Sequence, residues 1–223
     1  MSTDDSSLTL LVTANPDPRS LTHHVLERLE SALHPRAVEV ADLHQEQFEP
    51  RFTLADRRAY HEGGDYPPDV VREHRRLERA TDLVLVFPVY WWSMPALLKG
   101  WIDRVFVNGW AFDYSAASGL RPKLLQLTTH LLPVAGDDSG AYERHGYEGA
   151  LRTQIEHGIV DYCGSRRGAT AFIHESEQPS SEATAESVER AVRIISGAVR
   201  ADWTSLTPAR SNQRIPRRAF CSG

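Results

Sequence analysis

The segment "DLVLVFPVYWWSMPALLKGWIDRVF" (residues 82–106) joins two patterns that together decide the fold class. Its first part is a continuous apolar run of strand length, which Pro88 ends because proline has no amide hydrogen to give to a sheet. In its second part apolar residues recur at helical spacing, which predicts a helix with one buried face: Leu97, Leu98, Trp101, Ile102 and Val105. An apolar run without alternation is typical of a strand covered on both faces, as in a parallel sheet.

The same alternation of strand and helix continues along the chain. Four further runs of strand length are Leu8–Ala14, Ala37–Leu43, Lys123–Thr129 and Gly168–Glu175. Helical patterns lie between them, the first with Ser20 as its N-cap. The sequence therefore predicts an α/β protein whose five-stranded parallel sheet has the order 2-1-3-4-5, with helices on both faces. We expect one domain over residues 1–201 and a C-terminal tail over residues 202–223.

Composition excludes several classes of function. The chain has 223 residues and a formal net charge of −5, and its 25 basic residues form no stripe, so we expect no nucleic-acid partner. No run approaches the roughly 18 apolar residues of a membrane span, and the N-terminus lacks the basic region of a signal peptide. Cys163 and Cys221 are too few for a disulfide framework, which fits a cytoplasmic location. The ten histidines lack ligand spacing, so we expect no metal site.

Three loops are candidates for a ligand site, because ligands of such sheets bind at the carboxyl ends of the strands, near the point where strand order reverses. They are Asn15–Thr22, Pro88–Pro95 and Thr128–Tyr147. The first loop begins a helix and carries Arg19 and Ser20, and a guanidinium, hydroxyls and helix-start amides together suit a phosphate group. The alternative is an ordinary capped helix with an exposed arginine.

The second loop opens an aromatic cluster, since four of the chain's five tryptophans fall within residues 91–110. Wide aromatic side chains after a strand offer a flat wall to a planar ligand, and the backbone amides of residues 89–92 suit the edge of its ring. The alternative is that Trp91 and Trp92 pack under the following helix or form a subunit contact. The clustering favours a planar ligand.

The block "FPVYWWSMPALLKGWIDRVFVNGWAFDY" (residues 87–114) closely resembles the NAD(P)H:quinone oxidoreductase family of flavodoxin-like flavoproteins. That family includes drug-modulator-type quinone reductases and the ancillary flavoproteins of bacterial potassium-efflux systems. The resemblance implies a flavodoxin-like fold, a non-covalent FAD or FMN, and two-electron transfer from NAD(P)H to a quinone or similar flat aromatic acceptor by a ping-pong route. We expect FAD with FMN as the alternative, because the segment from Gln45 to Pro68 resembles that of FAD-binding members.

Carried over position by position, the resemblance implies which residues form the site. The cofactor-binding residues would be Asn15, Ser20, Leu21 and Thr22 on the phosphate side, Pro88, Val89, Tyr90, Trp91 and Trp92 along the ring edge, and Thr128 and Thr129 on its other side. Phe112 and Tyr114 match aromatic positions that reach the partner's substrate pocket in dimeric members. Tyr142 matches a tyrosine beside the flavin, and with His145 it is our candidate to stabilise negative charge on the reduced ring.

Two further expectations concern the third loop and the assembly. Family members usually continue from the two threonines with two glycines, whereas this chain has His130 and Leu131, so we expect the imidazole to crowd the ring. We also expect a homodimer, because one helix and the residues after it carry more apolar width than a single sheet face requires: Trp101, Val105, Phe106 and Trp110.

Two other classes of function stay open at the level of sequence. One is a flavin- or nucleotide-binding regulatory subunit of a potassium-efflux-type transporter, and the other is an electron-transfer partner of another enzyme. The aromatic wall favours an enzyme over a carrier, because a small carrier needs no acceptor pocket.

Overall fold

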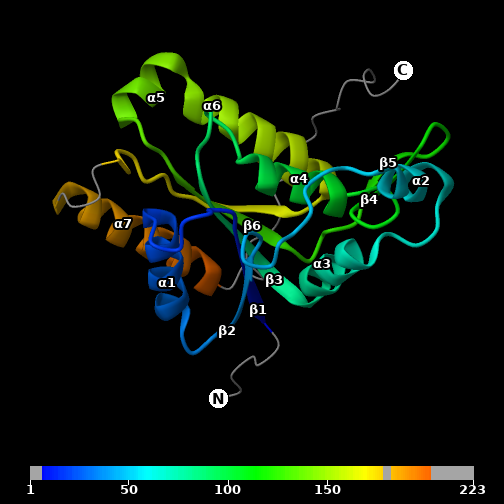
Figure 1. Cartoon of the computed structure of the whole chain (residues 1–223), viewed down its shortest axis with the longest axis horizontal. Coiled ribbons are helices and arrows are strands. Elements are labelled where there is room, and N and C mark those ends of the chain that lie inside the picture. The colour runs from blue at the N-terminus through cyan, green and yellow to red at the C-terminus, as the bar shows by residue number, and fades with distance from the viewer. Residues whose placement is uncertain (1–6, 178–181, 202–223) are drawn as a thin grey trace.

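The computed structural model describes residues 7–177 and 182–201, and a five-stranded sheet in these residues is layered between helices (Figure 1). The five parallel strands are β1 (Leu8–Thr13), β2 (Ala37–Asp42), β3 (Ala80–Pro88), β6 (Thr128–Val134) and β7 (Arg166–Thr170). Their order in the sheet is β2-β1-β3-β6-β7. This confirms the predicted parallel sheet, and the labels differ from the predicted 2-1-3-4-5 because an additional antiparallel pair, β4 (Phe112–Ser115) and β5 (Gly119–Pro122), lies outside it.

Helices cover both faces of the sheet, as the unalternating strand patterns predict. Successive residues of β3 point to opposite faces, and Val84 and Val86 pack with α1 (Leu21–Leu33) and α7 (Glu182–Arg200). Leu83 and Leu85 pack on the other side, against α3 (Pro68–Arg79) and α4 (Ala96–Val105). The remaining helices are α2 (Leu54–Glu62), α5 (Ser139–His145), α6 (Tyr147–Arg152) and the π-helix η1 (Thr153–Asp161).

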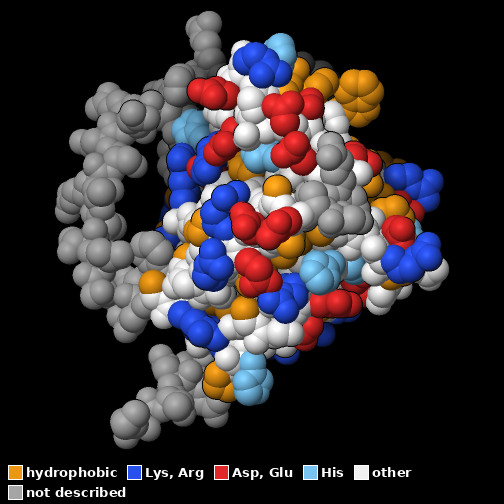
Figure 2. Space-filling model, turned by 90° about the vertical axis from the view of Figure 1, so that its left-hand side faces the viewer, with side chains coloured by type: hydrophobic (Ala, Val, Ile, Leu, Met, Phe, Trp, Pro, Cys, Tyr) orange, Lys and Arg blue, Asp and Glu red, His pale blue; other side chains and the backbone are white. Residues whose placement is uncertain are grey.

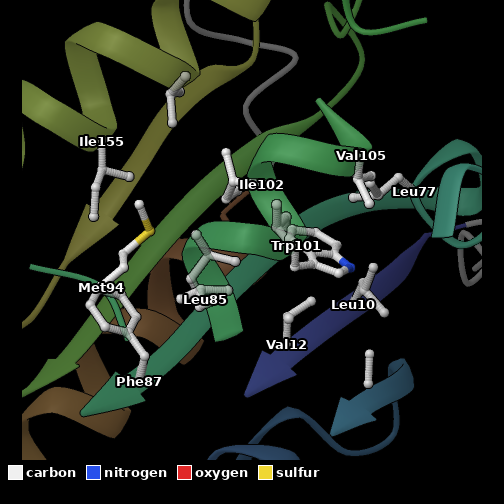
Figure 3. Close-up of a cluster of buried hydrophobic side chains, with 14 of the residues drawn as sticks. Leu10, Val12, Leu77, Leu85, Phe87, Met94, Trp101, Ile102, Val105 and Ile155 are labelled. Atoms are coloured by element: carbon white, nitrogen blue, oxygen red, sulfur yellow. The ribbon is translucent and has the colours of Figure 1, made fainter. Parts of the chain in front are cut away.

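Trp101 lies at the centre of the larger core, between α4 and the sheet (Figure 3). Its side chain is fully buried, and its indole Nε1 donates a hydrogen bond to Glu73 Oε2 at 3.1 Å. Val105 is also fully buried, and the ring of Phe106 contacts that of Trp101 edge-on. Trp110 stacks on His74 with 4.0 Å between ring centroids. Trp101 and Val105 therefore do not support the homodimer expected above, because they are buried within their own chain, whereas Phe106 and Trp110 are only partly buried.

The predicted fourth strand, Lys123–Thr129, is wrong in its bounds. The strand runs from Thr128 to Val134, with Thr128 beside Asp82 at the amino end of β3 and Val134 beside Pro88 at its carboxyl end. The error arose at His130, which is fully buried inside the strand although a polar residue suggests a loop. His130 Nδ1 accepts from Ala169 N at 3.0 Å, and Nε2 donates to Asp82 Oδ1 at 3.2 Å, so the imidazole is fully hydrogen-bonded.

The start of α1 and the bounds of the first two strands follow the predictions more closely. Ser20 caps α1, its hydroxyl accepting from His23 N. The predicted fifth strand, Gly168–Glu175, is also wrong in its bounds, because the strand runs from Arg166 to Thr170. The proposed tail over residues 202–223 lies outside the described residues. Within residues 7–177 and 182–201, no helix is long and apolar enough to cross a membrane.

Candidate functional site

The candidate site lies at the carboxyl edge of the sheet, where the strand order reverses between β1 and β3. Two backbone bonds tie the loops there together: Val89 N donates to Val134 O at 2.8 Å, and Ala135 N donates to Ile173 O at 2.7 Å. Figure 2 views the end of the molecule where α1, α5 and α7 lie, and acidic and basic side chains are interspersed across that face. The described part of this face thus offers no stripe of a single charge.

The first loop presents the N-terminus of α1, as predicted. Asn15 Nδ2 donates to Thr22 Oγ1 at 3.1 Å, and Asn15 Oδ1 accepts from Asp17 N at 3.0 Å, so the Asn15 side chain holds the loop in shape. The amides of Leu21 and Thr22 are the first two of the helix, which have no intrahelical acceptor. Ser20, Leu21 and Thr22 therefore form a helix start of the kind that binds phosphate groups.

The second loop is a strained two-residue turn. Tyr90 and Ser93 exchange two backbone hydrogen bonds of 3.1 Å, which leaves Trp91 and Trp92 at the tip. The backbone of both tryptophans is in the left-handed region, with φ of +50° at Trp91 and +57° at Trp92. Such a conformation costs a bulky residue roughly 1–2 kcal/mol, and strain of this kind is typical of ligand-binding loops. The amides of Trp91 and Trp92 make no hydrogen bond within the described residues, so both are available to a ligand.

The two tryptophans differ in their side-chain contacts. Trp91 is 87% exposed, whereas the ring of Trp92 stacks on Tyr147 with 4.3 Å between centroids and a 25° interplanar angle. Asparagine tolerates left-handed backbone at little cost. We therefore expect Trp91→Asn to raise the free energy of unfolding by about 0.5–1 kcal/mol, because strain is relieved and little burial is lost.

Trp92→Asn is the matched control for that prediction. It relieves the same backbone strain but removes the stack on Tyr147, so its free energy of unfolding should fall by about 1 kcal/mol. Denaturant unfolding of both variants checks the difference. A loss of more than 1 kcal/mol in Trp91→Asn would show that the Trp91 side chain stabilises the fold, contrary to its exposure.

The third loop is not where the sequence placed it. Thr128 and Thr129 are buried at the amino end of β6, and the Thr129 hydroxyl is hydrogen-bonded to Ser165 Oγ at 2.7 Å. They lie at the opposite edge of the sheet from the first two loops, so their assignment beside a flavin ring is wrong. The predicted crowding by His130 is wrong for the same reason. The segment that follows β6 at the carboxyl edge is Ala135–Asp138.

Tyr142 and His145, on α5, have different surroundings. Tyr142 is only 3% exposed, and burial, with a smaller effect of Asp137, raises the pKa of its hydroxyl to about 12. The hydroxyl is therefore protonated at neutral pH and able to donate. His145 is exposed, and its ring stacks on Tyr147 with 5.2 Å between centroids. Tyr147 thus has Trp92 and His145 as stacked neighbours, and it joins the second loop to α6.

His174, which the sequence did not single out, lies against Tyr142. The two ring centroids are 4.8 Å apart, and His174 Nδ1 is buried with no hydrogen-bond partner among the described residues. Burial lowers the pKa of this imidazole, which favours its neutral form. Ile173 is bonded to the end of β6, which explains why residue 174 reaches this edge. No local pattern could have found it, because its nearness to Tyr142 depends on the pairing of the chain beyond β7 with β6.

The predicted substrate residues, Phe112 and Tyr114, both lie on β4, but the first is buried and the second is exposed. Phe112 is 7% exposed and packs edge-on against Tyr162, so it belongs to the core of its own chain. Tyr114 is 58% exposed. Only Tyr114 can contact a ligand or a second subunit without rearrangement of the core. Among the described residues, no group of three or more His, Cys, Asp or Glu side chains could hold a metal ion.

Comparison with known proteins gives consistent matches. The model of the family described as "Flavodoxin-like fold" matches residues 7–195. Ribosyldihydronicotinamide dehydrogenase (quinone) of Pongo abelii is 31% identical over 196 residues, covering 78% of this chain and 84% of that protein. The NAD(P)H:quinone oxidoreductase from Methanothermobacter marburgensis has a similar structure, with a TM-score of 0.76 and 25% identity over 84% of this chain and 96% of the other.

A third match concerns the fold alone. The FMN-dependent NADH-azoreductase from Bacillus anthracis, solved in complex with FMN, has a TM-score of 0.64 at 14% identity. The match covers 86% of this chain and 97% of the other.

Proposed function

Because the chain belongs to the flavodoxin-like fold family, we propose that it is a flavin-dependent NAD(P)H oxidoreductase that passes two electrons to a quinone or similar flat aromatic acceptor. The observation that carries the proposal is the set of backbone donors at the carboxyl edge. The amides of Leu21 and Thr22 and those of Trp91 and Trp92 are available on neighbouring loops at the switch point.

These residues fit a flavin. The start of α1 suits the phosphate end, because free helix amides and the helix dipole both favour an anion. The turn at Trp91 and Trp92 suits the polar edge of the ring, with its two amides. We assign Tyr142 to the ring end as a hydroxyl donor, with the neutral imidazole of His174 beside it in the role first given to His145. A bound flavin supplies the chemistry of accepting a hydride and returning two electrons, and the chain supplies binding, orientation and hydrogen-bond donors.

Several finer points are part of the same proposal. The cofactor is FAD, with FMN as the alternative, and the reductant is NADH or NADPH. The protein is cytoplasmic and forms a homodimer in which Tyr114 reaches the partner's pocket, a role that its exposure permits. The relatives named above are enzymes by name, which favours this function over a regulatory subunit or an electron carrier.

The purified protein should contain or take up one flavin per chain and oxidise NAD(P)H in a menadione-dependent reaction. Mass spectrometry of the flavin released by heat identifies the cofactor, and light scattering at tens of micromolar measures the assembly. Protein stripped of flavin should lose the menadione-dependent activity and regain it when the flavin is returned. Flavin binding without turnover of menadione would favour the regulatory alternative, and absence of flavin binding at micromolar concentration would overturn the proposal.

A further inference from the structure

Ser20, His23 and Asp42 form a chain of hydrogen bonds beneath the start of α1. His23 Nδ1 lies 3.1 Å from Ser20 Oγ, and His23 Nε2 lies 2.9 Å from Asp42 Oδ2. The side chains of His23 and Asp42 are each 10% exposed. The chain runs from the end of β2 to the residue that caps the helix, and none of the functions assigned above uses His23 or Asp42.

The surroundings of Asp42 decide which nitrogen of His23 carries a hydrogen. Asp42 Oδ1 accepts from the amides of His44 and Gln45, at 3.0 and 3.1 Å. The other oxygen, Oδ2, is left to accept from His23 Nε2. A carboxylate held in this way is an acceptor, so Nε2 bears a hydrogen in both protonation states of the ring. Only Nδ1, the nitrogen that faces Ser20, changes when the ring gains or loses a proton.

The state of Nδ1 sets the direction of the Ser20 hydroxyl. When His23 is neutral, Nδ1 is an acceptor, and the Ser20 O–H turns inward to donate to it. When His23 is protonated, Nδ1–H donates to Ser20 Oγ, which already accepts from His23 N at 3.3 Å. The hydroxyl hydrogen is then free to donate outward, to a group bound at the start of the helix.

We propose that His23 is a positioning residue that couples the binding of a phosphate group at the start of α1 to the uptake of one proton. The proton passes from solvent to His23 Nδ1, and Ser20 transmits its effect by turning its hydroxyl outward to donate a hydrogen bond to the phosphate. The inference rests on the proposed function, which places the phosphate end of the flavin at this helix start. It adds that the affinity for a phosphate-bearing flavin falls as the pH rises, because the bound state holds one more proton than the free state.

Asp42 is the charged side chain in contact with the His23 ring, so the coupling has one dominant electrostatic partner. The β1 and β3 side chains that pack with α1 are apolar, among them Leu11 and Val84. The other titratable or charged groups on the neighbouring elements are exposed or paired elsewhere: His24 and Glu27 on α1, Asp17 with Arg19 in the loop, His44 after β2, and Glu189 of α7 with Arg28.

The test measures the dissociation constants of FAD and FMN for the native protein and for His23→Gln between pH 5.5 and 8.5, by quenching of flavin fluorescence. The ratio of the native to the variant constant should rise with pH, by up to about tenfold per pH unit where one proton is taken up. Titration of the ligand's own phosphate cancels in this ratio. His24→Gln is the matched control: it removes an exposed imidazole one residue away and should keep the native pH profile.

Riboflavin, which has the ring but no phosphate, separates the two ends of the site. The ratio of the native to the His23→Gln dissociation constant for riboflavin should not change with pH, and a rise equal to that for FAD would overturn the coupling. Ser20→Ala keeps the His23–Asp42 pair and removes the hydroxyl, so the ratio of the native to the Ser20→Ala constant for FAD should rise with pH as it does for His23→Gln. This variant serves if His23→Gln does not fold. If FAD binds tightly but its native-to-variant ratio does not change with pH, the coupling alone is overturned. If no flavin binds at any pH, the proposed function is overturned with it.

Discussion

Replacing Trp101 with alanine should lower the free energy of unfolding by about 3–5 kcal/mol, the usual cost of removing a large aromatic side chain from a core. Trp101 is fully buried between α4 and the sheet, where it packs with Leu10, Val12 and Leu77 (Figure 3). The change also leaves Glu73, which is fully buried, without the indole donor at 3.1 Å. Chemical denaturation monitored by circular dichroism measures the loss.

Trp91→Asn provides the comparison, because it removes the same side chain from the same aromatic cluster. Trp91 is 87% exposed, so this variant should be as stable as the native protein or slightly more stable. A loss below 1.5 kcal/mol in Trp101→Ala would contradict a core role. In that case Trp101 would have to be reconsidered as part of a binding wall.

The contrast between these two tryptophans shows what the sequence could and could not predict. Their clustering suggested a common role. Helical spacing was the better guide to burial, since Trp101 lies three residues after Leu98 and next to Ile102, both of which are buried. Trp91 lies in a two-residue turn, and its left-handed backbone has no signature in a sequence without Gly or Asn there. Helical periodicity therefore identifies core residues, whereas the clustering of tryptophans alone does not separate buried residues from exposed ones.

The sheet itself was predictable, because strands buried on both faces give apolar runs that need no knowledge of their partners. The bounds of β6 were not, because they depend on a buried His130 that donates a hydrogen bond to Asp82 and accepts one from the amide of Ala169. This single misplacement moved Thr128 and Thr129 to the wrong edge of the sheet. His174 was missed for a related reason, since its contact with Tyr142 arises from pairing between distant segments.

Arg104→Met should also lower the free energy of unfolding by about 3–5 kcal/mol at neutral pH, because it leaves the buried carboxylate of Asp56 and the partly buried one of Asp69 without their charged partner. The guanidinium of Arg104 bonds Asp56 at 3.1 Å, Asp69 at 2.5 Å and the carbonyl of Glu49 at 2.8 Å. Asp56 is fully buried and Arg104 is 2% exposed. The residue thereby ties α2, α3 and the chain before α2 to α4, the helix that follows the strained turn.

Arg72→Met is the matched control, since it makes the same substitution in an ion pair of similar length. Arg72 lies 3.1 Å from Glu73, but its side chain is 48% exposed, so the loss should not exceed about 1 kcal/mol. Equal losses in the two variants would mean that the chain length of the arginine, and not the burial of its charge, determines the cost.

The difference in free energy of unfolding between the native protein and Arg104→Met should become smaller in acid, because of the pKa of Asp69. Burial acts to raise the pKa of Asp69, but the hydrogen bond and charge of Arg104 outweigh it, so the pKa is lowered. A carboxyl group whose pKa is lowered in the folded state stabilises the fold at pH values above the ordinary aspartate pKa, near 3.9. That stabilisation is lost as the pH falls through the lowered pKa of the folded state. Arg104→Met lacks the contribution at every pH, so the gap between native and variant should narrow below about pH 4. A gap that stays constant from pH 7 to pH 3 would show that lost packing of the arginine stem, and not its charge, accounts for the destabilisation.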